Sequence, residues 1–296
     1  MRANIIKALI KFFAYFPLRI LHAIGHIIGA TLYALPNNVK KRTRINVQHC
    51  LPEKTTQEQD LLVKSSLIET AKTTMEIATF WSWPISKLNP LLQESASCQL
   101  FKDALAKKQA IIVLTPHLGA WEMVGLYCAR LHPITCMYRP PRLEDLEPII
   151  KSGRARMNIK LAPTDQHGIR ILSRVLKQNE TIGILPDQDP GKNGGMYVPF
   201  FNQPANTMTL ASRFALKTKC PVFCIYAERL PKGQGYLIHC EKAPSKVSDG
   251  TLEESVTAVN QLVEKCIRQI PSQYQWSYKR FKNPPPGERN IYRRKR

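Results

Sequence analysis

Residues 110–123, AIIVLTPHLGAWEM, decide the fold of this chain. The run up to Leu114 is apolar at every position, which is typical of a strand that is buried on both faces of a sheet. Pro116 ends the strand, His117 follows it, and residues 119–131 have the pattern of a helix. A buried strand that leads through a polar turn into a helix is the repeating unit of a parallel α/β sheet.

The same alternation of apolar runs and helical patterns continues along the chain. We predict strands at 133–138, 181–186, 221–228 and 235–241, and helices at 54–83, 144–158, 167–178, 207–218 and 252–270. Residues 194–201 are predicted to be a loop. The pattern predicts an α/β fold with a largely parallel central sheet that helices flank on both faces.

The first 35 residues differ from the rest because they contain no acidic residue. In a helix their basic residues and histidines share one stripe, and apolar side chains cover the remaining surface. This pattern fits a helix in the membrane interface, or a span packed on a polar partner, and Pro17 should kink or divide it. A secretory signal and a buried core helix are alternatives, but no clear cleavage site follows. We predict an N-terminal membrane-anchoring helix at residues 1–35 and a catalytic domain at 36–296.

The chain is strongly basic. Its 43 Lys and Arg residues outnumber 22 Asp and Glu residues and give a formal charge of +21. Nucleic acid, an anionic membrane and an acidic protein are the partners that such a charge favours. Lys40, Lys41, Arg42 and Arg44 follow the apolar N-terminal segment, a position that favours anionic lipid head groups and the cytoplasmic side. Because no nucleic-acid-binding module is recognisable, we predict no nucleic-acid partner.

Several site classes are unsupported by the sequence. The eight cysteines include no C-x-x-C pair, so we predict small buried side chains in a reducing compartment. Phosphate-binding and dinucleotide-binding glycine motifs are absent, and so is a G-x-S-x-G nucleophile motif. No second histidine lies at metal-ligand spacing from His117. We therefore predict neither a metal nor a cofactor.

Polar residues follow three of the predicted strands, and this places them at one edge of the sheet. His117 and Glu122 can meet if His117 precedes the helix and Glu122 lies in its first turns. An imidazole held by a carboxylate is a general-base pair, although a helix-capping histidine and a surface glutamate would give the same spacing.

The other two strand ends carry further candidates. Tyr138 and Arg139 end the second strand, and the third ends in LPDQDPG at 185–191. Asp187 and Asp189 in that segment are candidates for substrate contact, and turn formation is the alternative role for both.

Together these motifs resemble the bacterial lipid A biosynthesis acyltransferases, the lauroyl and myristoyl family within the lysophospholipid acyltransferase superfamily. His117 to Glu122 matches the family's H-x-x-x-x-[DE] motif. Further matches are Tyr138-Arg139-Pro140, LPDQDPG with VPFF in 185–201, TRINVQHCLPE at 43–53 and QYQWSYKRFKNPPPG at 273–287. The chain departs from the family pattern at Leu118 and at Ala120. It also departs at Tyr278, where the family often has histidine.

The resemblance implies acyl transfer from acyl carrier protein to a hydroxyl group of a lipid A precursor. His117 would act as the base and Glu122 would orient it. Arg139 would stabilise an oxyanion or bind a phosphate, with Tyr138, Asp187 and Asp189 also contacting substrate. The implied partners are acyl carrier protein, an anionic lipid acceptor and the inner membrane, with the catalytic domain on the cytoplasmic side.

Other acyltransferases share the same core motif. An enzyme that acylates a glycerophospholipid, a mannoside lipid or an amino-lipid stays an alternative, and so does an inactive scaffold of the same fold.

Overall fold

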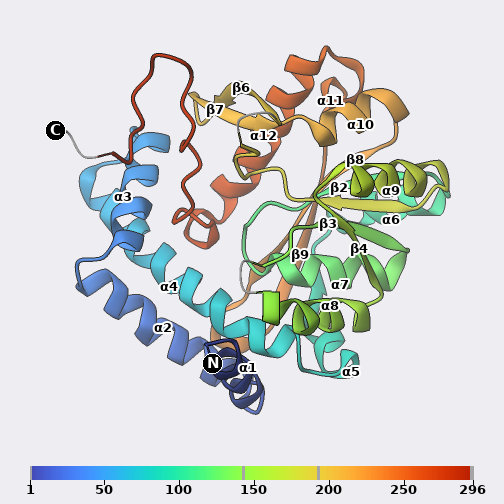
Figure 1. The fold of residues 1–296 in the computed structure, drawn as a ribbon. Helices are drawn as coiled ribbons and strands as arrows, with labels where there is room; N and C mark the ends of the chain where they lie inside the picture. Colours follow the sequence, from blue (N-terminus) through green and yellow to red (C-terminus); the bar gives the residue numbers. More distant parts are fainter. Residues whose placement is uncertain (1, 142–143, 192–193, 294–296) are drawn as a thin grey trace.

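The computed structural model of this chain describes residues 2–141, 144–191 and 194–293 (Figure 1). Within them a seven-stranded sheet has the order β1-β9-β8-β2-β5-β3-β4. The strands are β1 Leu92–Glu94, β2 Ile111–Leu114, β3 Ile134–Tyr138, β4 Ile159–Pro163, β5 Thr181–Ile184, β8 Val222–Arg229 and β9 Tyr236–Lys242. The pairs from β8 to β4 are parallel and only the β8–β9 pair is antiparallel within this sheet, so the largely parallel sheet is confirmed.

Helices flank this sheet. They are α3 Asn38–Cys50, α4 Thr56–Phe80, α5 Ile85–Leu88, α6 Cys98–Ala106, α7 Trp121–Leu131, α8 Glu147–Arg156, α9 Gln166–Lys177, α10 Leu210–Thr218, α11 Lys246–Asp249 and α12 Leu252–Gln269. Successive residues of β2 point to opposite faces, so Ile112 and Leu114 join one buried apolar cluster while Ile111 and Val113 join another. The first cluster includes α9, α10 and α12, and the second includes α6 and α7.

The sequence did not predict every element. Residues expected to form a loop belong to the hairpin of β6 Gly195–Phe200 and β7 Gln203–Met208, which pair outside the main sheet. Strands β1 and β4 were also not expected, because β1 is three residues long and β4 contains Lys160 and ends on a proline. The predicted burial of cysteines is confirmed, since seven of the eight are buried and Cys136 is half-buried.

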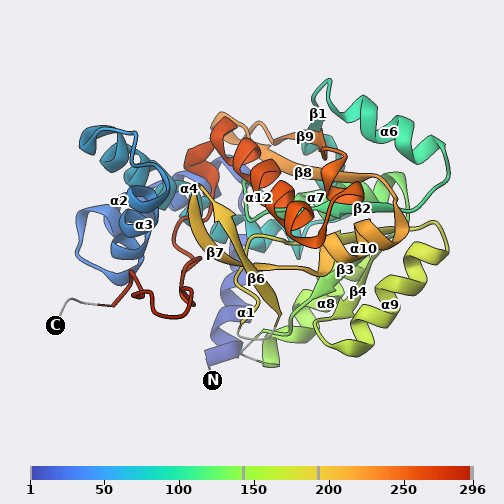
Figure 2. The same ribbon diagram turned by 90° about the horizontal axis from the view of Figure 1, so that it is seen from above.

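The apolar N-terminal segment forms α1 Arg2–Phe13 and α2 Leu18–Ala34, which separate at Pro17 as expected. Both views place α2, α3 and α4 together beside the sheet (Figure 1 and Figure 2). A Cβ added to Gly29 would lie 2.3 Å from the Cα atom of Ile68. Glycine therefore allows α2 to pack directly on the backbone of α4.

The predicted anchoring role of this segment stays a prediction. Among the described residues, no helix alone has both the length and the apolar composition that crossing a bilayer requires. Helices α2 and α3 reach that threshold only as a pair, with a bend of 81° between them.

Candidate active site

The turn after β2 presents His117 at the carboxyl edge of the sheet, and its backbone is held on both sides. Gly119 has a φ of +61°, and a Cβ there would lie 2.0 Å from the carbonyl oxygen of Ala227 in β8. Only glycine fits this turn without strain. The amide of Ala120 donates to the Ala227 carbonyl at 2.8 Å, and the carbonyl of His117 accepts from the amide of Gln275 at 3.1 Å.

Asp187, at the end of β5, holds His117 through both of its carboxylate oxygens. His117 Nδ1 lies 2.8 Å from Asp187 Oδ1, and the His117 backbone amide donates to Oδ2 at 2.9 Å. Burial alone would raise the pKa of Asp187, but the imidazole and the hydrogen bonds from His117 lower it below its usual value. An ionised Asp187 therefore fixes a proton on Nδ1 and leaves Nε2 as the basic nitrogen.

The second imidazole nitrogen lies on the accessible side of this pair. The amide Nε2 of Gln188 donates to His117 Nε2 at 3.1 Å. The His117 side chain is 14% exposed, whereas that of Asp187 is 2% exposed. The indole of Trp121 packs beside the imidazole, with ring centroids 5.1 Å apart. The basic nitrogen thus faces a group that an incoming hydroxyl could replace.

Glu122 lies in the first turn of α7, as expected, but its carboxylate is directed elsewhere. It forms a two-pronged ion pair with Arg154 of α8, in which Arg154 Nε donates to Glu122 Oε2 at 3.1 Å and Nη2 donates to Oε1. Glu122 is therefore not placed beside the imidazole in this structure, and its catalytic role stays a prediction. Asp187 occupies that position because the parallel β2 and β5 end side by side.

A small cavity of about 60 Å³ adjoins the Glu122–Arg154 pair. Trp121 separates it from His117, and Gly125 and Gly183 line its apolar wall. A Cβ at either glycine would lie 2.7 Å from the end of a neighbouring side chain, so a larger residue at either position would require that neighbour to shift.

Tyr138 and Arg139 end β3, the strand beyond β5. The ring of Tyr138 is buried beneath the guanidinium of Arg154, 5.2 Å from its centroid. Arg139 is exposed, and no hydrogen bond or ion pair joins it to another described residue. Its predicted role as an oxyanion donor or phosphate ligand stays a prediction.

Asp189 holds the loop after β5 in place. Its Oδ1 accepts hydrogen bonds from the amide of Gly191 at 2.8 Å and from Asn283 Nδ2 at 2.9 Å. The hydroxyl of Tyr278 accepts from the backbone amide of Asp189 at 3.1 Å. These contacts give Asp189 and Tyr278 structural roles, and substrate contact by Asp189 stays a prediction.

The geometry can be compared with known proteins. The sequence model of the bacterial lipid A biosynthesis acyltransferases matches residues 3–283. This chain belongs to that family. It is 25% identical to the lipid A biosynthesis palmitoleoyltransferase of Escherichia coli K12 over 279 residues, which are 93% of this chain and 89% of that one.

Two further relatives agree. The lipid A biosynthesis lauroyltransferase of the same strain is also 25% identical, over 93% of this chain and 90% of its own. A lipid A biosynthesis acyltransferase of Haemophilus influenzae is 27% identical, over 91% of this chain and 86% of its own. Family membership confirms the resemblance and makes the chain an acyltransferase of lipid A biosynthesis.

Two residues of the site were not anticipated. Arg154 and Gln188 take part in it, but Arg154 is one of many basic residues in an unremarkable helix. Gln188 lies between Asp187 and Asp189 in a segment that the sequence did place at the sheet edge. That segment was the only signal for Gln188: in the structure Asp187 and Gln188 both contact the imidazole of His117, whereas Asp189 holds its own loop.

Proposed function

We propose that this protein transfers a fatty acyl chain from acyl carrier protein to a hydroxyl group of a lipid A precursor, with His117 as the general base and Asp187 as its partner. The observation that carries the proposal is the His117–Asp187 pair, whose second nitrogen faces the accessible side, in a chain of the lipid A acyltransferase family.

The reaction needs a base because a neutral hydroxyl attacks a thioester poorly. His117 Nε2 takes the hydroxyl proton while the oxygen attacks the thioester carbonyl carbon. The tetrahedral intermediate then collapses, the new ester C–O bond is retained and the C–S bond breaks. The imidazolium returns the proton to the departing thiolate, and ionised Asp187 stabilises the imidazolium in between.

Gln188 marks the place of the attacking group. Its side-chain amide lies 3.1 Å from His117 Nε2. The oxygen of an acceptor hydroxyl would lie at about this distance from Nε2 in a productive complex. The acceptor hydroxyl must therefore displace this amide before it can give up its proton.

The charge distribution fits two anionic substrates. Acyl carrier protein is acidic and a lipid A precursor carries phosphates, while this chain has a formal charge of +21. Arg139 is exposed at the same edge of the sheet as His117 and is therefore placed to bind a phosphate of the acceptor. Arg154 is engaged by Glu122 beside the apolar cavity, where the pair would lie next to the acyl chain.

We further propose that α1 and α2 rest on the inner membrane from its cytoplasmic side. Ile5, Leu9, Phe12 and Tyr15 of this segment expose about half of their surface or more, and so does Ile27. An apolar surface of this size on acid-free helices fits insertion into the membrane interface.

A basic groove lies at the carboxyl end of α2. It lies between the end of α2 and α3, has a volume of about 650 Å³, and is lined by Lys40, Lys41 and Arg44. A groove of this charge beside an inserted helix fits anionic head groups at the membrane surface.

Mass spectrometry of lipid A from cells with and without this protein tests the proposed reaction. We expect the two to differ by the mass of one acyl chain. The purified protein should add the same chain to a lipid A precursor when acyl carrier protein, rather than coenzyme A, carries it. Identical lipid A from both cells would contradict the proposal.

The membrane proposal needs a test that leaves α2 in place, because removal of α2 would uncover the carboxylate of Glu76 on α4. The double substitution Phe12→Glu and Ile27→Glu changes only exposed side chains and should release the protein from membranes. Leu100→Glu, at an exposed apolar residue of α6, is the matched control and should not. Undiminished sedimentation of the double variant with membranes would exclude this surface.

A further inference from the structure

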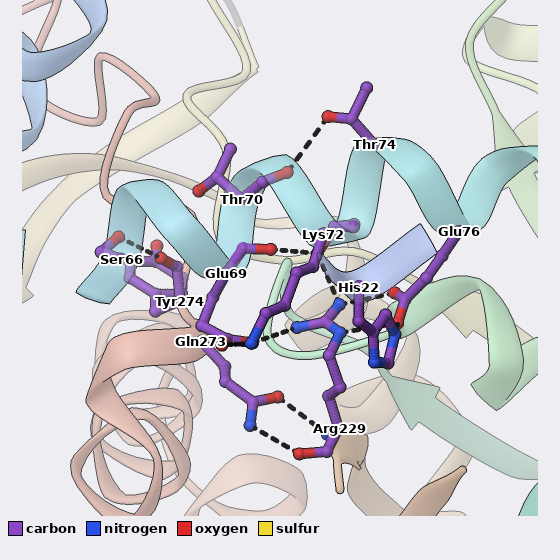
Figure 3. A network of polar contacts seen from close by, with 11 residues as sticks. His22, Ser66, Glu69, Thr70, Lys72, Thr74, Glu76, Arg229, Gln273 and Tyr274 are labelled. Carbon is purple, nitrogen blue, oxygen red and sulfur yellow. Dashed lines mark hydrogen bonds and ion pairs between the residues drawn. The ribbon is translucent and has the colours of Figure 1, made fainter. Parts of the chain in front are cut away.

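A buried cluster of charged side chains connects α2 to the end of β8 (Figure 3). Glu76 of α4 is completely buried, and its Oε1 lies 2.6 Å from His22 Nε2 of α2. Arg229, the last residue of β8, donates from Nε to Glu76 Oε1 at 2.6 Å and from Nη1 to Glu69 Oε2 at 2.7 Å. Its Nη2 also donates to Thr73 Oγ1 at 2.7 Å.

The charges in this cluster are matched, so the cluster is rigid. Burial alone would raise the pKa of Glu76, but Arg229, with a hydrogen bond from His22, lowers it to about 2. Glu76 is therefore ionised at neutral pH. Each of the three guanidinium nitrogens of Arg229 donates to an acceptor, so the pair resists rearrangement, because a displacement would leave a buried charge unpaired.

Gln273 connects this cluster to the next segment of the chain. Its Oε1 accepts from the backbone amide of Arg229 at 2.8 Å, and its Nε2 donates to the backbone carbonyl of Arg229 at 3.0 Å. Figure 3 shows both bonds between the two residues. One side chain thus satisfies both backbone groups of Arg229, as a neighbouring strand would.

The backbone of Gln273 in turn holds the turn that carries His117. Its carbonyl accepts from the amide of Gly119 at 3.0 Å, two residues after His117. Gly119 also lies against Ala227, two residues before Arg229 in the same strand. The turn 117–120 is therefore fixed between β8 and the Gln273 segment, and Arg229 and Gln273 fix these two supports to each other.

We infer that Gln273 is a positioning residue for His117, and that the chain of contacts from His22 through Glu76, Arg229 and Gln273 makes the setting of the imidazole depend on the seating of α2. The catalytic half of this inference rests on the proposed function, whereas the structural half does not. If α2 is the membrane-contacting helix, the position of α2 on α4 and the orientation of the His117 imidazole are linked through these hydrogen bonds.

Amide hydrogen exchange on the full-length protein tests the structural half without any assay of activity. In Gln273→Leu we expect the amide of Gly119 to exchange about tenfold faster or more, measured relative to the amides of β2, which report on opening of the core. Gln59→Leu is the matched control, because Gln59 Nε2 also donates to a backbone carbonyl, that of Leu51 at 2.9 Å, far from this turn in the sequence. An unchanged Gly119 exchange rate in Gln273→Leu overturns the inference.

Kinetics test the catalytic half. Gln273→Leu should lower kcat about tenfold and leave KM for both substrates unchanged. Gln273→Glu keeps the acceptor for the Arg229 amide and should therefore recover part of the lost kcat. A rise in KM alone would overturn the positioning role. If the wild-type protein transfers no acyl chain, the proposed function fails, and the exchange result still decides the structural half.

The part played by α2 has its own test. His22→Phe keeps an aromatic ring but removes the hydrogen bond to Glu76. It should speed exchange at Gly119 by a smaller factor, and that extra effect should disappear in the Gln273→Leu background, because the connection is already broken. Equal effects in both backgrounds would show that α2 does not act on the turn through Gln273.

Discussion

Two of the histidine–carboxylate pairs among the described residues have nearly the same contact and different surroundings. His117 lies 2.8 Å from Asp187 at the carboxyl edge of the sheet, and His22 lies 2.6 Å from Glu76 under the N-terminal helix. Both carboxylates are buried. The His117–Asp187 pair has its other ring nitrogen on an accessible side, against the replaceable amide of Gln188. The His22–Glu76 pair is enclosed by α2 and α4, and Arg229 neutralises its carboxylate.

The difference shows that the contact alone does not define a general base. Asp187 has no guanidinium against it among the described residues, so its charge is free to stabilise an imidazolium that forms during reaction. The charge of Glu76 is already paired with that of Arg229, and His22 is buried. We therefore assign catalysis to the first pair and support of the fold to the second.

The largest expected effect separates the two pairs directly. His117→Ala should lower acyl transfer by about 10²–10⁴-fold, the usual contribution of a general base, with folding and membrane binding intact. His22→Ala, the same change in the other pair, should lower thermal stability and reduce turnover much less. Steady-state transfer from acyl carrier protein to a lipid A precursor measures both. Comparable turnover in the two variants would remove the distinction.

Glu122 and Arg154 form a third charged pair that sharpens the assignment. Glu122→Gln should lower kcat at least tenfold because it leaves the partly buried charge of Arg154 unmatched. Glu122→Gln combined with Arg154→Gln removes both charges and should recover part of the loss. If Glu122 instead acted on His117, the double variant would be no better than the single one.

Arg139 should affect binding rather than chemistry. It is exposed, so Arg139→Ala should raise KM for the phosphorylated acceptor severalfold and change kcat little. Kinetics at varied acceptor concentration give this division. A hundredfold fall in kcat without a change in KM would make Arg139 an oxyanion donor instead.

The smallest expected effect concerns acid stability. The pKa of Glu76 is about 2 in the folded protein, and an unfolded glutamate has a pKa of about 4.3. Its contribution to stability is therefore complete above about pH 4.3 and is lost as the pH falls toward 2. Urea unfolding between pH 5 and 2.5 should show a steeper loss of unfolding free energy in the wild type than in Glu76→Gln. Parallel curves would show that Glu76 is not held ionised by Arg229.

The sequence predicted the sheet and its edge, but not which side chains meet there. Buried strands such as β2 and β5 are continuous apolar runs, and the rule that parallel strands end at one edge placed His117 and Asp187 together. The choice of Glu122 as partner came from its closeness in the sequence. Asp187 is 70 residues away, and only the register of β2 beside β5 brings it to the imidazole.

The buried cluster of His22, Glu76 and Arg229 could not be predicted from the sequence for a related reason. His22 was assigned to a polar stripe on the N-terminal helical segment, but in α2 it lies against Glu76 of α4. Its partner Glu76 lies on a helix, and Arg229, the partner of Glu76, lies at a strand end 153 residues further along the chain. Periodicity within a helix contains no information on which distant charge will be placed against it.

The most direct test of the account is the turnover of Asp187→Asn. This change keeps the size of the side chain and removes the negative charge that fixes the Nδ1 proton and stabilises the imidazolium. We expect kcat for transfer to a lipid A precursor to fall by about 100-fold or more, with KM for acyl carrier protein and acceptor nearly unchanged. Near-normal kcat in Asp187→Asn, in a protein whose His117→Ala variant is inactive, would contradict it.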